Sequence, residues 1–318
     1  YLRNNIAHQN KTGVSLREFQ YKSPKELLGS KKAKEVSKNY KKCVLASKSI
    51  TYEEELAETD LSAVKEILAG LIQKNRYQEQ PVWGSINNVY AKTHIAEFPW
   101  MPEEELRGAV ELEAGEFTSS DWGEIDVDYE VIETLPDDQV RVLFVVCPRY
   151  LTEAYIDLFR ECNLYPVGLT VDAISTAKSF QYAFPPDQRP GRWSVLLDVG
   201  AANTNINVVD GADLRVVRNV PFGENSLKEQ GMKKEEHNST AETEDQSLVW
   251  KVTPLLTELQ RTIEYYQRSL RQREEGANTE DFRMYMCGGE AFFSVISEVL
   301  KDRIQTNVEV LDPFAKLK

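Results

Sequence analysis

The residues of this chain best suited to chemistry lie in a short turn between two apolar stretches. Residues 195–204 read VLLDVGAANT, so an apolar strand ends in Asp-x-Gly and is followed by small and polar residues. Glycine and alanine let backbone N–H groups approach an anion closely, and Asn203 and Thr204 add side-chain donors. Asp198 can hold a magnesium ion through water, because magnesium keeps several of its waters. The pattern indicates a phosphate-binding hairpin; the alternative is an ordinary β-hairpin whose aspartate caps its own turn.

A second glycine-containing turn lies near the end of the chain. Residues 285–291 read YMCGGEA, so a strand runs into two glycines that open a helix. The N-terminus of such a helix offers unpaired N–H groups and the positive end of the helix dipole. The turn therefore suits a polar or anionic ligand, although Gly-Gly before a helix also serves as a packing turn.

Several other catalytic and ligand-binding motifs are absent from the sequence. It contains no GxxxxGK[ST], GxGxxG, GxSxG or HExxH, so a P-loop, a dinucleotide site, a nucleophile elbow and a zinc protease site are not supported. The three histidines are far apart and the four cysteines contain no CxxC. These spacings indicate neither a zinc site nor a disulfide framework, which suits a reducing compartment. No catalytic residue is predicted.

The second half of the chain must supply the elements that position the two turns. The predicted strands are Trp193–Val199, Asn203–Val209, Leu214–Val220, Arg283–Cys287 and Val308–Leu311. Asp210-Gly211 predicts a tight hairpin between the second and third of them. A long helix is expected over 255–270 and a shorter one over 292–300. The polar stretch 223–246 is expected to be an excursion from the fold.

The first half of the chain shows a similar mixture of strands and helices. The expected helices are 61–72, about 103–117, 151–162 and 172–182, and the expected strands are 81–86, 89–95, 127–132, 140–147 and 164–171. The Pro-rich stretch 185–192 is the best boundary between the two halves. The mixed order of elements predicts an α/β protein.

Length and charge exclude several classes of protein. The chain has 318 residues, which favours two domains, and its 41% hydrophobic content is enough for a real core. With 38 basic and 51 acidic residues, the net charge is −13, which disfavours nucleic acid as a partner. The longest apolar run, 142–147, is far shorter than the roughly 20 residues that span a bilayer.

The charge is distributed unevenly along the chain. Residues 1–50 hold 12 basic and three acidic residues, a balance of +9, so the remaining residues carry −13 − 9 = −22. Residues 53–138 alone hold 22 acids and five bases. This asymmetry is typical of a basic segment that touches a membrane surface or a partner, and a solvated basic helix is the alternative.

Several segments, in this order, resemble the type IV pilus assembly protein PilM family, within the actin, FtsA and sugar-kinase superfamily. The resemblance covers roughly residues 80–315. The segments that carry it are FPWMPEEEL (98–106), Glu113-Ala114 with Asp128-Tyr129, LDVGAANT (197–204), FGENSL (222–227), ELQRTIEYY (258–266), Cys287-Gly288-Gly289 and LDPF (311–314).

The resemblance implies an α/β, actin-like (ribonuclease H-like) two-domain fold with a small inserted α+β subdomain in the first domain. The first domain is expected over 1–184, with the insert at about 99–150, and the second over 185–318. ATP and magnesium are the implied cofactors, with Asp198 as the candidate metal ligand. The candidate cofactor-binding residues are Asp198, Gly200, Ala201, Ala202, Asn203 and Thr204 at the phosphates and Gly288, Gly289 and Glu290 at the adenosine.

The sequence departs from the family pattern at two positions that bear on activity. The family's first phosphate loop has the form Asp-x-Gly-Ser, and residues 1–20 contain only Thr12-Gly13-Val14-Ser15. Glu224 replaces the second glycine of the family's FGG turn and puts a carboxylate near the expected phosphates. We therefore expect weak ATP binding with little or no hydrolysis.

By resemblance, the chain is expected to be a cytoplasmic scaffold of a type IV pilus or related secretion machine, at the inner face of the cytoplasmic membrane. Its expected partner is a PilN-like bitopic protein, which inserts its N-terminal cytoplasmic tail into a groove of the first domain. Homo-oligomers and peripheral membrane contact are compatible with this role. The alternatives are an FtsA-like filament or membrane-tethering protein and a sugar-kinase-like phosphotransferase. Asp172 is the one candidate base for the latter.

Overall fold

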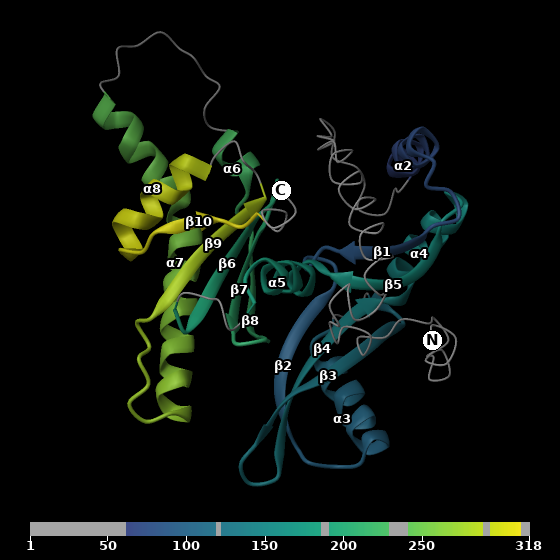
Figure 1. Cartoon of the computed structure of the whole chain (residues 1–318), viewed down its shortest axis with the longest axis horizontal. Helices are drawn as coiled ribbons and strands as arrows, with labels where there is room; N and C mark the ends of the chain where they lie inside the picture. The colour runs from purple at the N-terminus through teal and green to yellow at the C-terminus, as the bar shows by residue number, and fades with distance from the viewer. Residues whose placement is uncertain (1–61, 119–121, 186–190, 229–240, 289–292, 313–318) are drawn as a thin grey trace. The chain divides into compact units, whose positions relative to one another are not determined.

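The computed structural model describes residues 62–118, 122–185, 191–228, 241–288 and 293–312 (Figure 1). The chain divides into two compact units. The first unit contains the residues up to Ile86 and Tyr90–Val171, and the second contains Asn87–Val89 and the chain from Asp172 onward. The expected domain limits at 184/185 and the expected insert at about 99–150 remain predictions.

The first unit contains two small sheets. Its elements are α2 (Ser62–Asn75), β1 (Pro81–Ile86), β2 (Lys92–Pro99), α3 (Glu103–Glu116), β3 (Ile125–Leu135), β4 (Gln139–Pro148), α4 (Arg149–Glu161) and β5 (Tyr165–Val171). Among the described residues, β1 and β5 form a parallel pair, and β2-β4-β3 form an antiparallel sheet. Alternate residues of that sheet, including Val142 and Phe144, pack against Leu106 and Val110 of α3.

The second unit is built on a five-stranded sheet. Its elements are α5 (Asp172–Ala183), β6 (Trp193–Val199), β7 (Thr204–Asp210), β8 (Asp213–Val220), α6 (Glu224–Lys228), α7 (Ala241–Arg273), β9 (Phe282–Gly288), α8 (Phe293–Ile304) and β10 (Val308–Val310). The strand order is β10-β9-β6-β7-β8. One face of the sheet, with Val195 and Leu197, packs against apolar residues of α7 and α8 such as Leu259 and Ile296.

The opposite face of the five-stranded sheet carries α5. Phe180 of α5 packs on Tyr285 of β9 with 4.9 Å between ring centroids. Gln181 donates from Nε2 to the Ala212 carbonyl at 2.5 Å. Because α5 makes these contacts with strands of the second unit, it belongs structurally with that unit, as the division before Asp172 indicates.

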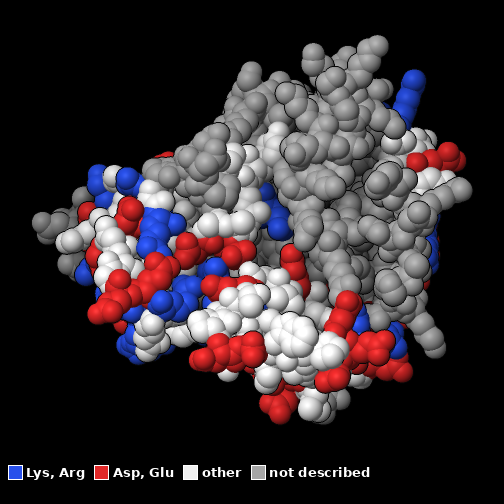
Figure 2. Space-filling view, turned by 60° about the horizontal axis from the view of Figure 1, so that its bottom comes forward, with Lys and Arg blue, Asp and Glu red and all other residues white. Residues whose placement is uncertain are grey.

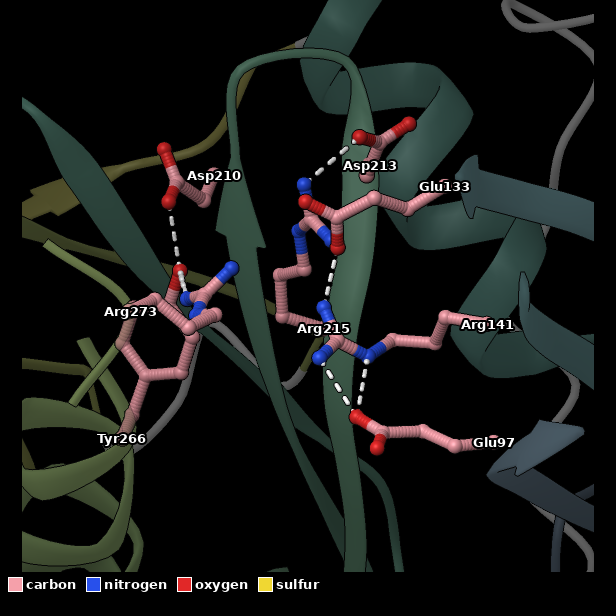
Figure 3. A network of polar contacts seen from close by, with 8 residues as sticks. All are labelled: Glu97, Glu133, Arg141, Asp210, Asp213, Arg215, Tyr266 and Arg273. Atoms are coloured by element: carbon pink, nitrogen blue, oxygen red, sulfur yellow. Dashed lines mark hydrogen bonds and ion pairs between the residues drawn. The ribbon is translucent and has the colours of Figure 1, made fainter. Parts of the chain in front are cut away.

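Polar contacts fasten elements within each unit (Figure 3). In the first unit, Arg141 of β4 pairs with Glu97 of β2 and Glu133 of β3, so one guanidinium joins three strands. In the second unit, the Tyr266 hydroxyl of α7 donates to Asp210 Oδ2 at 2.5 Å, which fixes α7 to the end of β7.

Most expected elements are present, and three expectations differ from the structure. The strand expected over 89–95 is β2, which runs over Lys92–Pro99. Helix α7 begins at Ala241 and passes through Pro254, whereas the sequence predicted a start near 255. The stretch 223–246 is not wholly an excursion, since α6 and the first turns of α7 occupy parts of it. Asp60, which precedes the expected helix 61–72 and is of a residue type that commonly caps a helix N-terminus, lies outside the described residues. No helix in the described ranges is long and apolar enough to cross a membrane.

Candidate functional site

The predicted phosphate hairpin is the connection between β6 and β7. The two strands pair antiparallel: Trp193 lies opposite Asp210 at one end, and Val199 lies opposite Thr204 at the other. Residues 200–203 form the turn between them. The Gly200 N–H donates to the Asn203 carbonyl at 2.9 Å, which closes the turn. Gly200, Ala201 and Ala202 are exposed, and Asn203 is half-buried.

Helix α6 rests on the carbonyl side of this turn. The N–H groups of Glu224 and Asn225 donate to the carbonyls of Gly200 and Ala201 at 3.0 and 2.8 Å. Gly223 permits this approach, because a Cβ there would lie 2.4 Å from the Ala201 oxygen. The contact fixes the peptide orientation of the turn. It also holds the backbone of Glu224 against the carbonyl side of the turn.

The N–H side of the turn is available to a ligand. Among the described residues, none accepts a hydrogen bond from the N–H groups of Ala201, Ala202 or Asn203. Three successive N–H groups in a turn of small residues are donors of the kind that bind anions. The turn therefore fits a phosphate group on chemical grounds.

Asp198 lies at the end of β6 in a polar environment. Its Oδ2 accepts a hydrogen bond from Thr176 Oγ1 of α5 at 3.1 Å. Its register partners are Asn205 on β7 and Cys287 on β9, and both also donate to its carboxylate. Asn205 is in turn held by Asn219 of β8, whose Nδ2 donates to Asn205 Oδ1 at 2.9 Å. Three other elements thus hold this carboxylate directly, and β8 supports one of them through Asn219.

Burial dominates the electrostatics of this carboxylate. It raises the pKa of Asp198, and the hydrogen bonds from Thr176, Cys287 and Asn205 offset part of that rise. The Cys287 thiol next to it has a raised pKa for the same reason, with the Asp198 charge as a further cause. A bound cation would favour the ionised form of Asp198.

Thr204 faces the interior, away from the turn's exposed side. Its side chain is fully buried, and its hydroxyl donates to the Phe222 carbonyl at 2.7 Å. This contact ties the start of β7 to the segment that leads into α6. The expected ligand role of Thr204 remains a prediction, and the observed role of its hydroxyl is to hold the hairpin.

The second predicted turn lies beside the first. Gly288 ends β9 opposite Val199, the last residue of β6. Its φ is +96°, and a Cβ there would lie 2.1 Å from the Val199 oxygen, so only glycine fits. The two strand ends therefore bring Gly288 and the hairpin to the same edge of the sheet. Gly289 and Glu290 lie outside the described residues.

The described residues at the hairpin fit a magnesium ion and phosphate groups, with Asp198 as the candidate carboxylate for the metal. No group of three or more His, Cys, Asp or Glu side chains in the described ranges is arranged to hold a metal ion. Magnesium does not need such a group, because it commonly takes one or two carboxylates, water and substrate phosphates. Asp198 is a suitable carboxylate ligand for magnesium, and the N–H groups of the turn are suitable donors to the phosphates.

Sequence reasoning missed three residues of this site: Thr176, Asn205 and Asn219. Thr176 comes from a helix more than 20 residues before Asp198, so no local pattern joins them. The Asn-x-Asn spacing of Asn203 and Asn205 was visible, since alternate strand residues share a face. The strand register was needed to place Asn219 beside Asn205.

One protein-family model matches most of the chain. The family model described as type IV pilus assembly protein PilM matches residues 28–318. The chain belongs to the type IV pilus assembly protein PilM family. The resemblance predicted from the sequence is therefore confirmed, and so is the α/β, actin-like fold class that it implied.

A solved structure supports the fold of this PilM family member. The structure of the "PilM-PilN type IV pilus biogenesis complex" is 20% identical, with a TM-score of 0.59 over 84% of this chain and 79% of that chain. At this identity the likeness shows a shared fold. No curated protein sequence matches the chain.

Two other solved structures are more distant from this PilM family member. A Bacteroides thetaiotaomicron protein with an actin-like ATPase fold and unknown function is 10% identical, with a TM-score of 0.38 over 84% of this chain and 82% of that chain. MreB 5 of Spiroplasma citri bound to AMPPNP is 13% identical, with a TM-score of 0.32 over 51% of this chain and 60% of that chain. TM-scores this low carry no argument about function.

Proposed function

We propose that this chain is a scaffold of type IV pilus assembly or a related secretion machine, at the inner face of the cytoplasmic membrane. In that position it binds the N-terminal cytoplasmic tail of a PilN-like bitopic membrane protein. The observation that carries the proposal is family membership across residues 28–318. The shared fold with the PilM chain of a PilM-PilN complex supports it.

The charge of the first unit supports a basic tail as the partner. Residues 53–138 hold 22 acids and five bases, and they include α3, where Glu103, Glu104, Glu105, Glu111 and Glu116 are exposed. Opposite charge steers association and favours the correct partner. We therefore place the tail-binding surface in the first unit.

Calorimetric titration tests the scaffold proposal. The probe is a synthetic peptide with the cytoplasmic tail sequence of the PilN-like protein encoded beside this chain, titrated into the full chain. We expect saturable binding that weakens as salt rises, because salt screens charge pairs. A peptide of the same composition in scrambled order is the control. Equal binding of both peptides, or of neither, would contradict the proposal.

We propose further that the hairpin site binds ATP with magnesium, weakly and with negligible turnover. The nucleotide phosphates would take the N–H groups of Ala201, Ala202 and Asn203, and Asp198 would hold magnesium through water. Magnesium would supply charge neutralisation of the phosphates. Gly288, Gly289 and Glu290 are the proposed adenosine residues. Glu224 beside the turn is the reason to expect weak binding.

We expect negligible turnover because we identify no positioned base near the hairpin among the described residues. The one candidate from the sequence, Asp172, is the first residue of α5, where an acidic side chain interacts favourably with the helix dipole. A phosphotransferase needs a positioned base and complete phosphate contacts. The scaffold proposal therefore explains the site better than the kinase alternative.

Two variants, each of which changes one alanine to glutamate, test the nucleotide proposal by calorimetry with ATP and magnesium. Ala202→Glu puts a carboxylate on the turn and should weaken binding at least about tenfold, or about 1.4 kcal/mol. Ala212→Glu makes the same change in the turn at the other end of β7 and should leave binding unchanged. No heat and no thermal shift at millimolar ATP for the unaltered chain would overturn the nucleotide claim and leave the scaffold proposal intact.

A further inference from the structure

An exposed tryptophan lies at one end of the β2-β4-β3 sheet. Trp100 follows the last residue of β2, and 65% of its surface is exposed. Its backbone N–H donates to the Asp138 carbonyl at 2.6 Å, so it lies beside the β3–β4 hairpin. A large aromatic side chain left this exposed in a single chain is a common anchor of protein interfaces.

Acidic residues surround this tryptophan in the chain and in the fold. Asp137 and Asp138 form the hairpin beside it, and Glu103 and Glu104 open α3 a few residues later. All four are exposed. We call this set, with Trp100, the Trp100 patch. Figure 2 shows acidic side chains gathered along the lower edge of the view, where the β3–β4 hairpin and α3 come forward.

The nearby arginines are committed to other contacts. Arg141 pairs with Glu97 and Glu133, and the Arg107 guanidinium lies over the Tyr129 ring at 5.3 Å. Among the described residues, no Lys or Arg forms an ion pair with Asp137, Asp138 or Glu104. The patch thus presents an aromatic face and carboxylates to a cation from outside.

This combination recognises lysine or arginine side chains. A cation over a tryptophan face gains about 0.5–1 kcal/mol at an exposed site, and the carboxylates add charge pairs. An anionic lipid surface or a nucleic acid would be repelled by the same carboxylates. The ligand is therefore a basic peptide segment.

The chain itself contains a segment of the required chemistry. Residues 22–42 hold eight lysines and two glutamates, a balance of 8 − 2 = +6, with lysines closely spaced at 31, 32 and 34. We propose that the Trp100 patch docks residues 22–42 of a second copy of this chain. The contact joins two different surfaces of the protein, so it permits either reciprocal exchange in a dimer or continued assembly.

Sedimentation velocity of the full chain tests the proposal. At about 50 mM salt we expect concentration-dependent association, and at about 300 mM salt we expect it to be lost, since salt screens exposed charges. Trp100→Ala should weaken association at least about tenfold, because it removes the aromatic anchor. Trp250→Ala, which removes another exposed tryptophan on α7, should leave association unchanged.

Charge variants test the two sides of the contact separately. Asp137→Asn with Asp138→Asn removes two charges from the patch, and asparagine tolerates the positive φ of both positions. A triple Lys→Gln change at residues 31, 32 and 34 removes charge from the segment. Each should reduce self-association, and a labelled peptide of residues 22–42 should bind the unaltered chain more tightly than Trp100→Ala.

Three outcomes would overturn the proposal. The first is that the chain stays monomeric at low salt, whether or not the peptide of residues 22–42 binds to it. The second is association that Trp100→Ala leaves unchanged or that Trp250→Ala reduces equally. The third is loss of PilN-like tail binding in Trp100→Ala with self-association intact, which would assign the patch to the tail.

Discussion

At the scale of single residues, the candidate site depends on close backbone approaches and on one buried carboxylate. Gly288 is required where the end of β9 meets the end of β6, and Gly223 is required where α6 meets the hairpin. A Cβ at either position would overlap backbone atoms. Asp198 is held by side chains from three other elements. Substitutions at these positions therefore act on stability as well as on binding.

Gly288→Ala should destabilise the second unit more than Gly211→Ala. Both glycines have positive φ, which costs about 1–2 kcal/mol for another residue. Only Gly288 has backbone atoms in the path of a Cβ, which should add about 1–3 kcal/mol. Urea unfolding measures the difference, and equal losses for the two variants would contradict the geometry of β9 against β6.

Asp198→Asn should stabilise the chain at neutral pH. Burial raises the folded-state pKa of Asp198, so the folded chain resists ionising a group that the unfolded chain ionises freely. The resulting free-energy cost of burying the ionised carboxylate is absent below the pKa of aspartate in the unfolded chain, about 3.9, and grows as the pH rises through that value. The gain from Asp198→Asn should therefore shrink as the pH falls toward about 4. Thermal melts across this range measure it.

Asp302→Asn on the exposed face of α8 is the control for that series. It removes the same charge without relieving burial, so its effect on the melting temperature should vary little with pH. A gain from Asp198→Asn that persists unchanged at low pH would show that charge burial is not its cause.

At the scale of elements, the apolar strands were the most predictable part of the fold. The β6 prediction matched its observed limits, and the β7–β8 hairpin formed at Asp210-Gly211, because continuous apolar runs and turn residues are local signals. The early turns of α7 were missed because Pro254 normally ends a helix, and the burial of Val252 and Leu255 outweighs that preference here. The contact of Thr176 with Asp198 has no local signal at all.

Glu224→Gln should strengthen ATP binding through the contact of α6 with the hairpin. The Glu224 N–H donates to the Gly200 carbonyl, so the backbone of this residue is held against the turn. Removal of its charge should improve affinity several-fold, with at most about 1 kcal/mol expected for one screened charge. Calorimetry measures the change, with Glu258→Gln on α7 as the control. Unchanged affinity would remove Glu224 as the cause of weak binding.

At the scale of the whole molecule, the placement of α5 distinguishes two possible domain limits. The sequence predicted a limit near 184/185, and the compact units divide before Asp172. Helix α5 covers the sheet face that carries Leu196 and Tyr285, both fully buried. A second domain without α5 would expose that face to water.

Two fragments test this limit. Residues 172–316 should unfold cooperatively in urea and give a near-UV signal from Trp193, which stacks on Phe282 at 4.5 Å. Residues 191–316 should aggregate or unfold without cooperativity, because the loss of α5 exposes apolar area worth about 25 cal/mol per Å². Two equally stable fragments would favour the limit at 184/185.

The contact between Cys287 and Asp198 gives the site a chemical reporter of its own. The raised pKa of Cys287 keeps its thiol protonated at neutral pH, so alkylating reagents should react with it slowly. A magnesium ion at Asp198 would remove one cause of that raised pKa and so speed alkylation. Cys147 in the first unit, whose pKa burial raises to about 12, serves as an internal reference that magnesium should not affect. Mass spectrometry of the modified cysteines could then follow metal occupancy without any measurement of nucleotide turnover.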